Sequence, residues 1–183
     1  PMEKGKPKRE DNEYEREGTC SIFVACEPLA GKRYLKVTEQ RTKKDWAEFM
    51  QEVIDVQYRD AEKIILVMDN LNTHVLSSFY EAFDAPTARR LVGKVEIHST
   101  PKHGSWLNMA EIELSILARQ CLSDRMPSMD FVEKQVNAWQ TERNQAQVTI
   151  NWRFTTEDAR IKLKRLYPSF EAKEQDTGFS NEG

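Results

Sequence analysis

Asp69 is the first residue whose position suggests chemistry. It directly follows five apolar residues, 64 to 68, a run typical of a buried strand. In open α/β sheets, ligands and catalytic groups collect at the carboxyl ends of strands. A purely structural role fits the sequence equally well, because Asp69 and Asn70 can simply turn the chain through side-chain hydrogen bonds to the backbone.

Glu111 is the second such residue. It lies in a helical segment, 106 to 122, that is apolar over most of its circumference and is therefore expected to be largely buried. The helix carries one polar stripe at positions i, i+3, i+7 and i+11, made of Asn108, Glu111, Ser115 and Arg119. A buried carboxylate needs a partner, so Glu111 either binds a cation or forms a structural salt bridge, for which Arg119 is the obvious candidate. Glu113 lies off the stripe and is expected to face solvent.

Carboxylates from two separate elements suit a divalent metal ion. Mg²⁺ and Mn²⁺ prefer oxygen ligands, and a pair of such ions can activate the oxygen that attacks a phosphodiester and stabilise the oxygen that leaves. A third carboxylate normally bridges the two ions. The sequence therefore predicts Asp69 and Glu111 as metal ligands, with phosphodiester cleavage as the chemistry.

The composition sets limits on the class of protein. Hydrophobic residues make up 39% and charged residues 31% of the 183 residues, and no apolar run is long enough to span a membrane, so we expect a cytoplasmic protein. The net charge of -3 argues against binding nucleic acid by bulk electrostatics, so any DNA contact must come from local patches or another domain. Three cysteines without CxxC spacing, Cys20, Cys26 and Cys121, are expected to be buried reduced thiols.

The hydrophobic patterns predict one α/β domain. They indicate strands at 19–27, 33–40, 64–68 and 95–99, and helices at 42–54, 75–83, 86–91, 105–122, 131–143 and 156–166. The first two strands form an antiparallel hairpin, and the third is a central strand covered on both faces. We expect a mobile lead-in over residues 1–13, the domain over residues 14–168 and a disordered tail over residues 169–183.

Several ordered motifs resemble one known family. VMDNLNTH at residues 67–74 and TPKHGSWLNMAEIE at residues 100–113 look like the second and third acidic blocks of the insertion sequence 630 transposases, which are relatives of the mariner type. The resemblance extends from EYEREGTC near residue 13 to KLKRLYP ending at residue 168. It implies a ribonuclease H-like fold, with a mixed sheet flanked by helices, and cut-and-paste DNA transposition that depends on Mg²⁺ or Mn²⁺.

The resemblance also implies roles for particular residues. Asp69 matches the second acid of the family and Glu111 the third, whereas three neighbouring polar residues would orient carboxylates or DNA: Asn70, His74 and Asn108. The partners would be the DNA of the transposon ends and of the target, bound by a homodimer of the full-length enzyme. Candidate contacts to DNA are Lys102, His103 and a basic cluster formed by Arg160, Lys162, Lys164 and Arg165, although solvated surface charges would look the same.

The sequence departs from the family pattern at its start. The family's first aspartate ends an initial strand, and no such strand leads into Asp11. A helix-turn-helix region for reading transposon ends is also missing, so we expect this fragment alone to be inactive. Two alternatives stay open: a non-catalytic remnant that acts as a folded or interaction domain, and an unrelated metal-dependent phosphohydrolase on a doubly wound sheet, which the hairpin disfavours.

Overall fold

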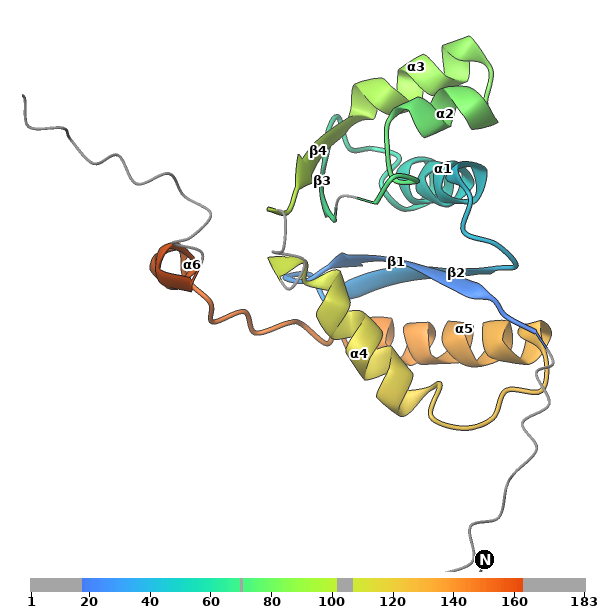
Figure 1. The fold of residues 1–183 in the computed structure, drawn as a ribbon, viewed down its shortest axis with the longest axis vertical. Coiled ribbons are helices and arrows are strands. Elements are labelled where there is room, and N and C mark those ends of the chain that lie inside the picture. The colour runs from blue at the N-terminus through green and yellow to red at the C-terminus, as the bar shows by residue number, and fades with distance from the viewer. Residues whose placement is uncertain (1–17, 70, 102–106, 163–183) are drawn as a thin grey trace, which may run out of the picture. The chain divides into compact units, whose positions relative to one another are not determined.

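The computed structural model describes residues 18–69, 71–101 and 107–162. The chain divides into two compact units, residues 1–150 and 151–183, and each is described by itself. In the first unit, the described residues form strands β1 to β4 and every helix except α6 (Figure 1). The expected lead-in and tail, residues 1–13 and 169–183, lie outside the described residues.

An antiparallel hairpin opens the fold, as the sequence predicts. Strand β1 (Ser21–Glu27) pairs with β2 (Lys32–Thr38) in a register that places Ser21 opposite Thr38. Gly31 ends the turn with φ +64°, and a Cβ there would lie 2.5 Å from the backbone of Gln147. Glycine is required at this position because of both its conformation and this close approach.

The first helix lies where the sequence predicts one, at residues 42–54. Helix α1 (Lys43–Glu52) begins with a capping box in which Thr42 and Asp45 exchange side-chain and backbone hydrogen bonds. A π-helical turn, η1 (Val53–Gln57), continues it. The five apolar residues that predict this amphipathic helix are all buried: Trp46, Phe49, Met50, Val53 and Ile54.

Strands β3 (Ile64–Met68) and β4 (Val95–Ser99) are parallel, and helices α2 (Ser77–Ala82) and α3 (Ala85–Lys94) connect them. The prediction that β3 is covered on both faces is wrong. Ile65 is 66% exposed and Val67 58% exposed, whereas the alternate residues turn toward the core. An unbroken apolar run does not reveal which of its faces is covered, so the sequence could not distinguish these cases.

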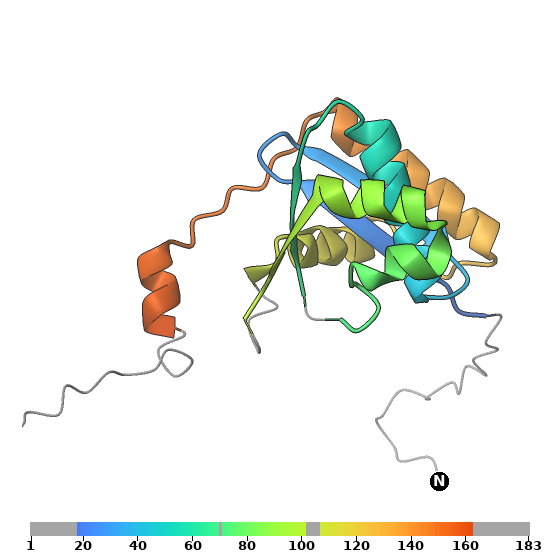
Figure 2. The same cartoon turned by 90° about the horizontal axis from the view of Figure 1, so that it is seen from above.

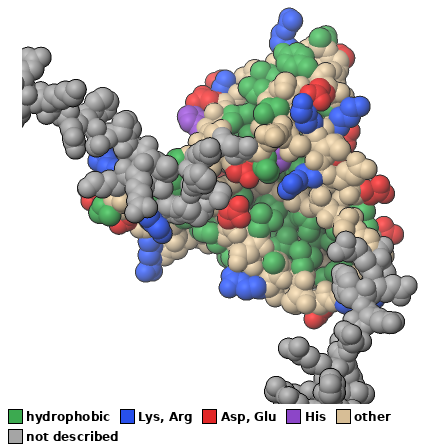
Figure 3. All heavy atoms as spheres, viewed as in Figure 1, with side chains coloured by type: hydrophobic (Ala, Val, Ile, Leu, Met, Phe, Trp, Pro, Cys, Tyr) green, Lys and Arg blue, Asp and Glu red, His purple; other side chains and the backbone are tan. Residues whose placement is uncertain are grey.

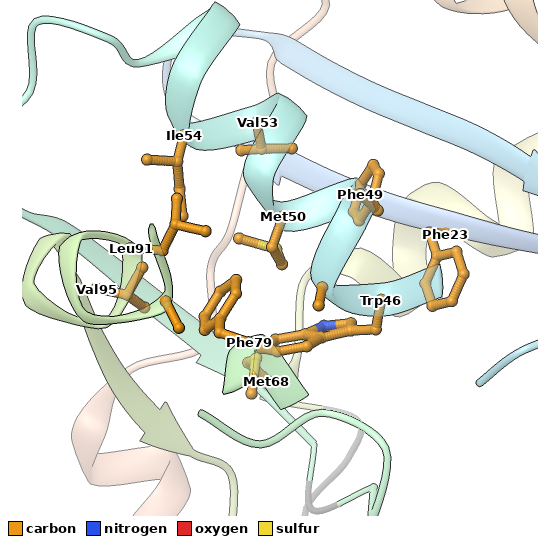
Figure 4. Close-up of a cluster of buried hydrophobic side chains, with 12 residues drawn as sticks. Phe23, Trp46, Phe49, Met50, Val53, Ile54, Met68, Phe79, Leu91 and Val95 are labelled. Carbon is orange, nitrogen blue, oxygen red and sulfur yellow. The ribbon is translucent and has the colours of Figure 1, made fainter. Parts of the chain in front are cut away.

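One hydrophobic core joins both pairs of strands. Phe23 of β1, Met68 of β3 and Val95 of β4 pack in the same buried cluster, with α1, α2 and α3 around it (Figure 4). Within the described part of the chain, β1 pairs only with β2, and β3 only with β4. The two small sheets therefore line the same core without pairing with each other.

A second core covers the other face of the hairpin. Helices α4 (Ala110–Gln120) and α5 (Met129–Gln145) pack there through Leu117, Val132, Val136 and Trp139, against Val37 of β2. The hairpin thus lies between α1 on one side and α4 and α5 on the other (Figure 1). The result is a mixed α/β arrangement compatible with a ribonuclease H-like domain.

The outer edge of β2 is closed by side chains of α5. Gln140 accepts a hydrogen bond from the backbone N–H of Leu35 at 2.6 Å, and Asn144 accepts one from the N–H of Arg33 at 2.9 Å. These amides occupy the donors that another strand would need, so this edge cannot be extended.

The described part of the second unit contains helix α6 (Thr156–Lys162), which Thr155 and Asp158 cap through reciprocal hydrogen bonds. No helix among the described residues has the length and apolar character needed to cross a membrane. The three cysteines are free and half-buried, somewhat more exposed than predicted.

Candidate metal centre

Asp69 lies directly after β3, at the carboxyl end of the strand, as the sequence predicts. The neighbouring strand continues alongside, because the N–H of Thr100 donates to the carbonyl oxygen of Met68 at 2.8 Å. The Asp69 side chain is 29% exposed, and no lysine or arginine of the described residues pairs with it. Its carboxylate therefore has coordination capacity left.

His74 is the neighbour that the structure brings to Asp69. Its Nδ1 lies 3.6 Å from Asp69 Oδ1, too long for a direct hydrogen bond but close enough for electrostatic interaction. The ring stacks on Trp46 at 5.6 Å between centroids and lies 6.1 Å from the ring of Phe23. His74 is thus both packed near the strand end and directed at the carboxylate.

Burial decides the charge of His74. Desolvation lowers its pKa below the usual value, against an opposing effect of the Asp69 carboxylate. The imidazole is therefore neutral at pH 7. Its Nε2 atom is buried without a hydrogen-bond partner among the described residues, which favours the tautomer with the proton on Nδ1, facing Asp69.

Glu111 lies in the first turn of α4 and is exposed. The alternative role for Glu111, a salt bridge to Arg119, is absent from the described part of the chain, where the guanidinium of Arg119 instead donates to the carbonyl of Ser115 at 3.2 Å. Asn108 accepts a hydrogen bond from the N–H of Ala110 at 3.1 Å and so satisfies one donor at the start of the helix. The dipole of the helix favours a negative charge in this turn.

The prediction that α4 is largely buried is wrong, and so is the prediction for Glu113. Only Glu113 and Leu117 of this helix are buried, and the Glu113 side chain has 0% exposure. Its carboxylate lies 3.1 Å from Nε of Arg33 and 3.3 Å from a terminal nitrogen of Arg143. The structural salt bridge considered for Glu111 is made by Glu113 instead.

Arg33 holds this ion cluster to the hairpin and α5. A terminal nitrogen of its guanidinium donates to the carbonyl of Val148 at 2.5 Å, and Asn144 bonds both its backbone groups. The sequence contained a signal for this arrangement. Arg33 alternates with Leu35 and Val37 on the face of β2 that meets the second core, and Glu113 precedes Leu117 by one helical turn.

The remaining predicted residues are only partly placed. Asn70, Lys102, His103 and Lys164 lie outside the described residues, and Arg160 is an exposed residue of α6 in the second unit. Both ribbon views place the ends of β3 and β4 and the start of α4 on the same side of the first unit (Figures 1 and 2). No hydrogen bond or ion pair of the described residues joins Asp69 to Glu111, as expected for two like charges.

Asp69 and Glu111 offer the type of ligand atom that a hard cation prefers, but they are too few ligands for a complete site. Asp69 and Glu111 offer carboxylate oxygens that no lysine or arginine of the described residues neutralises. Among the described residues there is no group of three or more His, Cys, Asp or Glu side chains that could hold a metal ion. Asp69 and His74 lie together, and Glu111 does not complete such a group with them.

Comparison with known proteins assigns the family. Residues 1–132 match the family model described as DDE superfamily endonuclease, which covers well over half of the chain. No curated protein and no solved structure matches the chain significantly. The match includes β1 to β4 and α4, the elements that carry Asp69 and Glu111. The chain belongs to the DDE superfamily of endonucleases.

Proposed function

We propose that this chain is the catalytic domain of a DNA transposase of the insertion sequence 630 type, which cleaves DNA strands and transfers them to a target. One observation carries the proposal. Asp69 and Glu111, the acids of the two matching motifs, have no lysine or arginine partner among the described residues, whereas Glu113, two positions along, is paired twice.

Asp69 and Glu111 would hold the metal ion. Bound Mg²⁺ or Mn²⁺ supplies the activation of the attacking oxygen and the stabilisation of the leaving one. The chain's own residues prepare the ligands: neutral His74 directs Nδ1 at the Asp69 carboxylate, and Asn108 fixes the backbone just before Glu111. A neutral histidine leaves the negative charge of Asp69 available to the cation.

The third carboxylate would arrive on an additional strand. The sheets of β1–β2 and β3–β4 line one core without pairing with each other, and α5 closes the outer edge of β2. Among the described residues, no strand pairs with the second edge of β1 or of β3, so a further strand could enter there. A strand that entered there and ended in aspartate would bring that residue to the same end of the sheet as Asp69.

The DNA partners and the assembly follow from the same proposal. The substrate would be the ends of a mobile element and its target DNA, and two copies of the full-length enzyme would act on paired ends. Arg160, exposed on α6, is one described candidate for a contact to the DNA backbone.

A plasmid transposition assay tests the proposal. The protein encoded by the complete reading frame should cleave and join DNA with Mg²⁺, and Asp69→Asn or Glu111→Gln should abolish both steps while leaving the protein folded. The 183-residue chain alone should do neither. Full activity in either variant would refute the site, and inactivity of the complete protein would favour the non-catalytic remnant.

A further inference from the structure

We propose that Glu113 is a positioning residue for the metal site: the ion cluster of Glu113, Arg33 and Arg143 fixes the rotation of α4 and so aims Glu111. The proposal rests on the proposed function, because it assigns Glu113 a task only if Glu111 is a metal ligand. Glu113 itself touches no metal, since its carboxylate is fully buried between two guanidinium groups.

Helix geometry links the two glutamates. Each residue turns the helix by about 100°, so side chains two positions apart point in nearly opposite directions. Glu113 faces the hairpin and α5 with 1% exposure, and Glu111 accordingly faces outward and is exposed. Whatever sets the direction of Glu113 also sets that of Glu111.

Few other contacts hold α4 in this rotation. Its buried residues are Glu113 and Leu117, and at its start the N–H of Ala110 donates a hydrogen bond to the side chain of Asn108. Leu114 is still 37% exposed, and hydrophobic side chains reach the surface on the face of the molecule that carries α4 (Figure 3). In the half of the helix that bears Glu111, the buried side chain is therefore Glu113, which the ion cluster holds.

The cluster connects three elements. Arg33 comes from β2 and is 1% exposed, Arg143 comes from α5 and lies 4.9 Å above the ring of Trp139, and Glu113 comes from α4. Glu113 Oε1 accepts hydrogen bonds from Arg33 at 3.4 Å and from Arg143 at 3.3 Å, and charge-assisted hydrogen bonds restrict angle as well as distance. An apolar side chain in place of Glu113 would fill the space but would tolerate rotation of the helix.

The affinity of the chain for Mn²⁺ tests whether the ion cluster orients the Glu111 side chain. Mn²⁺ binding to the 183-residue chain is followed by electron paramagnetic resonance, well below the unfolding temperature of every protein compared. Glu113→Gln, which keeps the shape but removes the charge, should weaken binding about 10- to 100-fold, the usual effect of removing a group that orients a metal ligand. Arg143→Lys, which keeps the charge but loses the planar fork, should weaken binding less.

Leu91→Ala is the matched control. Leu91 is fully buried in the first core, on α3, so its truncation lowers stability without touching α4. It should leave Mn²⁺ affinity unchanged. Equal losses in Leu91→Ala and Glu113→Gln would mean that general stability matters and would refute positioning.

The remaining outcomes separate the two proposals. In one of them, Glu111→Gln weakens Mn²⁺ binding while Glu113→Gln and Arg143→Lys both leave it unchanged. That result refutes the positioning role and leaves the proposed function intact. If the parent chain binds no Mn²⁺, or if Glu111→Gln does not change its affinity for Mn²⁺, the metal site itself is refuted. The positioning role is then refuted as well.

Discussion

Two acidic regions of this molecule differ in how their charge is held. At the end of β3, Asp69 is partly exposed, and the ionisable side chain that pairs with it among the described residues is a neutral histidine. In the second core, Glu113 is buried between Arg33 and Arg143, and its charge is compensated within the protein. One region can still accept a cation, and the other cannot.

Exposure and partners also distinguish the two glutamates of α4, which the sequence separated by the polar stripe and by the motif. A buried carboxylate is costly to remove once its partners are buried with it, because they lose their counter-charge. An exposed carboxylate without a cationic partner, such as that of Glu111, contributes little to stability. Replacing Glu113 is therefore expected to lower the stability of the protein, whereas replacing Glu111 should affect its function and leave its stability nearly unchanged.

The largest expected effect is on the free energy of unfolding. Glu113→Ala should lower it by about 3 to 5 kcal/mol, because it leaves Arg33 buried without a counter-charge. Glu111→Ala should change it by no more than about 0.5 kcal/mol, the usual range for an exposed site. Urea unfolding followed by circular dichroism measures both, and similar losses at the two positions would contradict the comparison.

A chemical readout of the same cluster comes from Cys26, the cross-strand neighbour of Arg33. Burial and, next, the Glu113 carboxylate raise the pKa of its thiol to about 11, while Arg33 opposes them. Glu113→Gln removes one cause and leaves Arg33 unopposed, so the pKa of Cys26 should fall. Alkylation by iodoacetamide near pH 8.5 should then become faster, because the thiolate is the reactive form.

This measurement needs a background in which Cys20 and Cys121 are serine, so that only Cys26 reacts. Leu91→Ala, remote from the cluster, is again the control and should leave the alkylation rate unchanged. An unchanged rate in Glu113→Gln would show that the carboxylate does not influence this thiol.

The smallest expected effect is a change in how stability depends on pH, and it arises from His74 beside Asp69. Burial lowers the pKa of His74 in the folded protein, so the unfolded chain binds a proton at a higher pH than the folded chain does. Stability should therefore fall as the pH drops through the ordinary histidine value of about 6.5. In His74→Gln, the urea midpoint should depend less on pH between about 7.5 and 5.5, and an unaltered dependence would argue against a buried neutral imidazole.

Local patterns predicted much of the fold. The capping box of Thr42 and Asp45, the five buried apolar residues of the first helix and the strand at 95–99 were all readable, because each depends on neighbours in sequence. The outward faces of Ile65 and Val67 were not, because burial of a strand face depends on elements elsewhere in the chain.

The candidate site was predictable to a similar degree. Asp69 at a strand end and Glu111 on a polar stripe follow from pattern and motif. The pairing of Glu113 joins residues 80 and 30 positions apart, Arg33 and Arg143, and no local rule reports such contacts. The apolar alternation around Arg33 was the available hint that this arginine faces the core and needs an acid.

Paramagnetic broadening by Mn²⁺ in an amide nuclear magnetic resonance spectrum tests the central claim most directly. Substoichiometric Mn²⁺ added to the labelled chain should first broaden the signals of residues around Asp69 and His74 together with those around Glu111. Asp69→Asn and Glu111→Gln should each reduce the broadening at both places. Broadening elsewhere, or at one place independently of the other, would contradict a shared metal site.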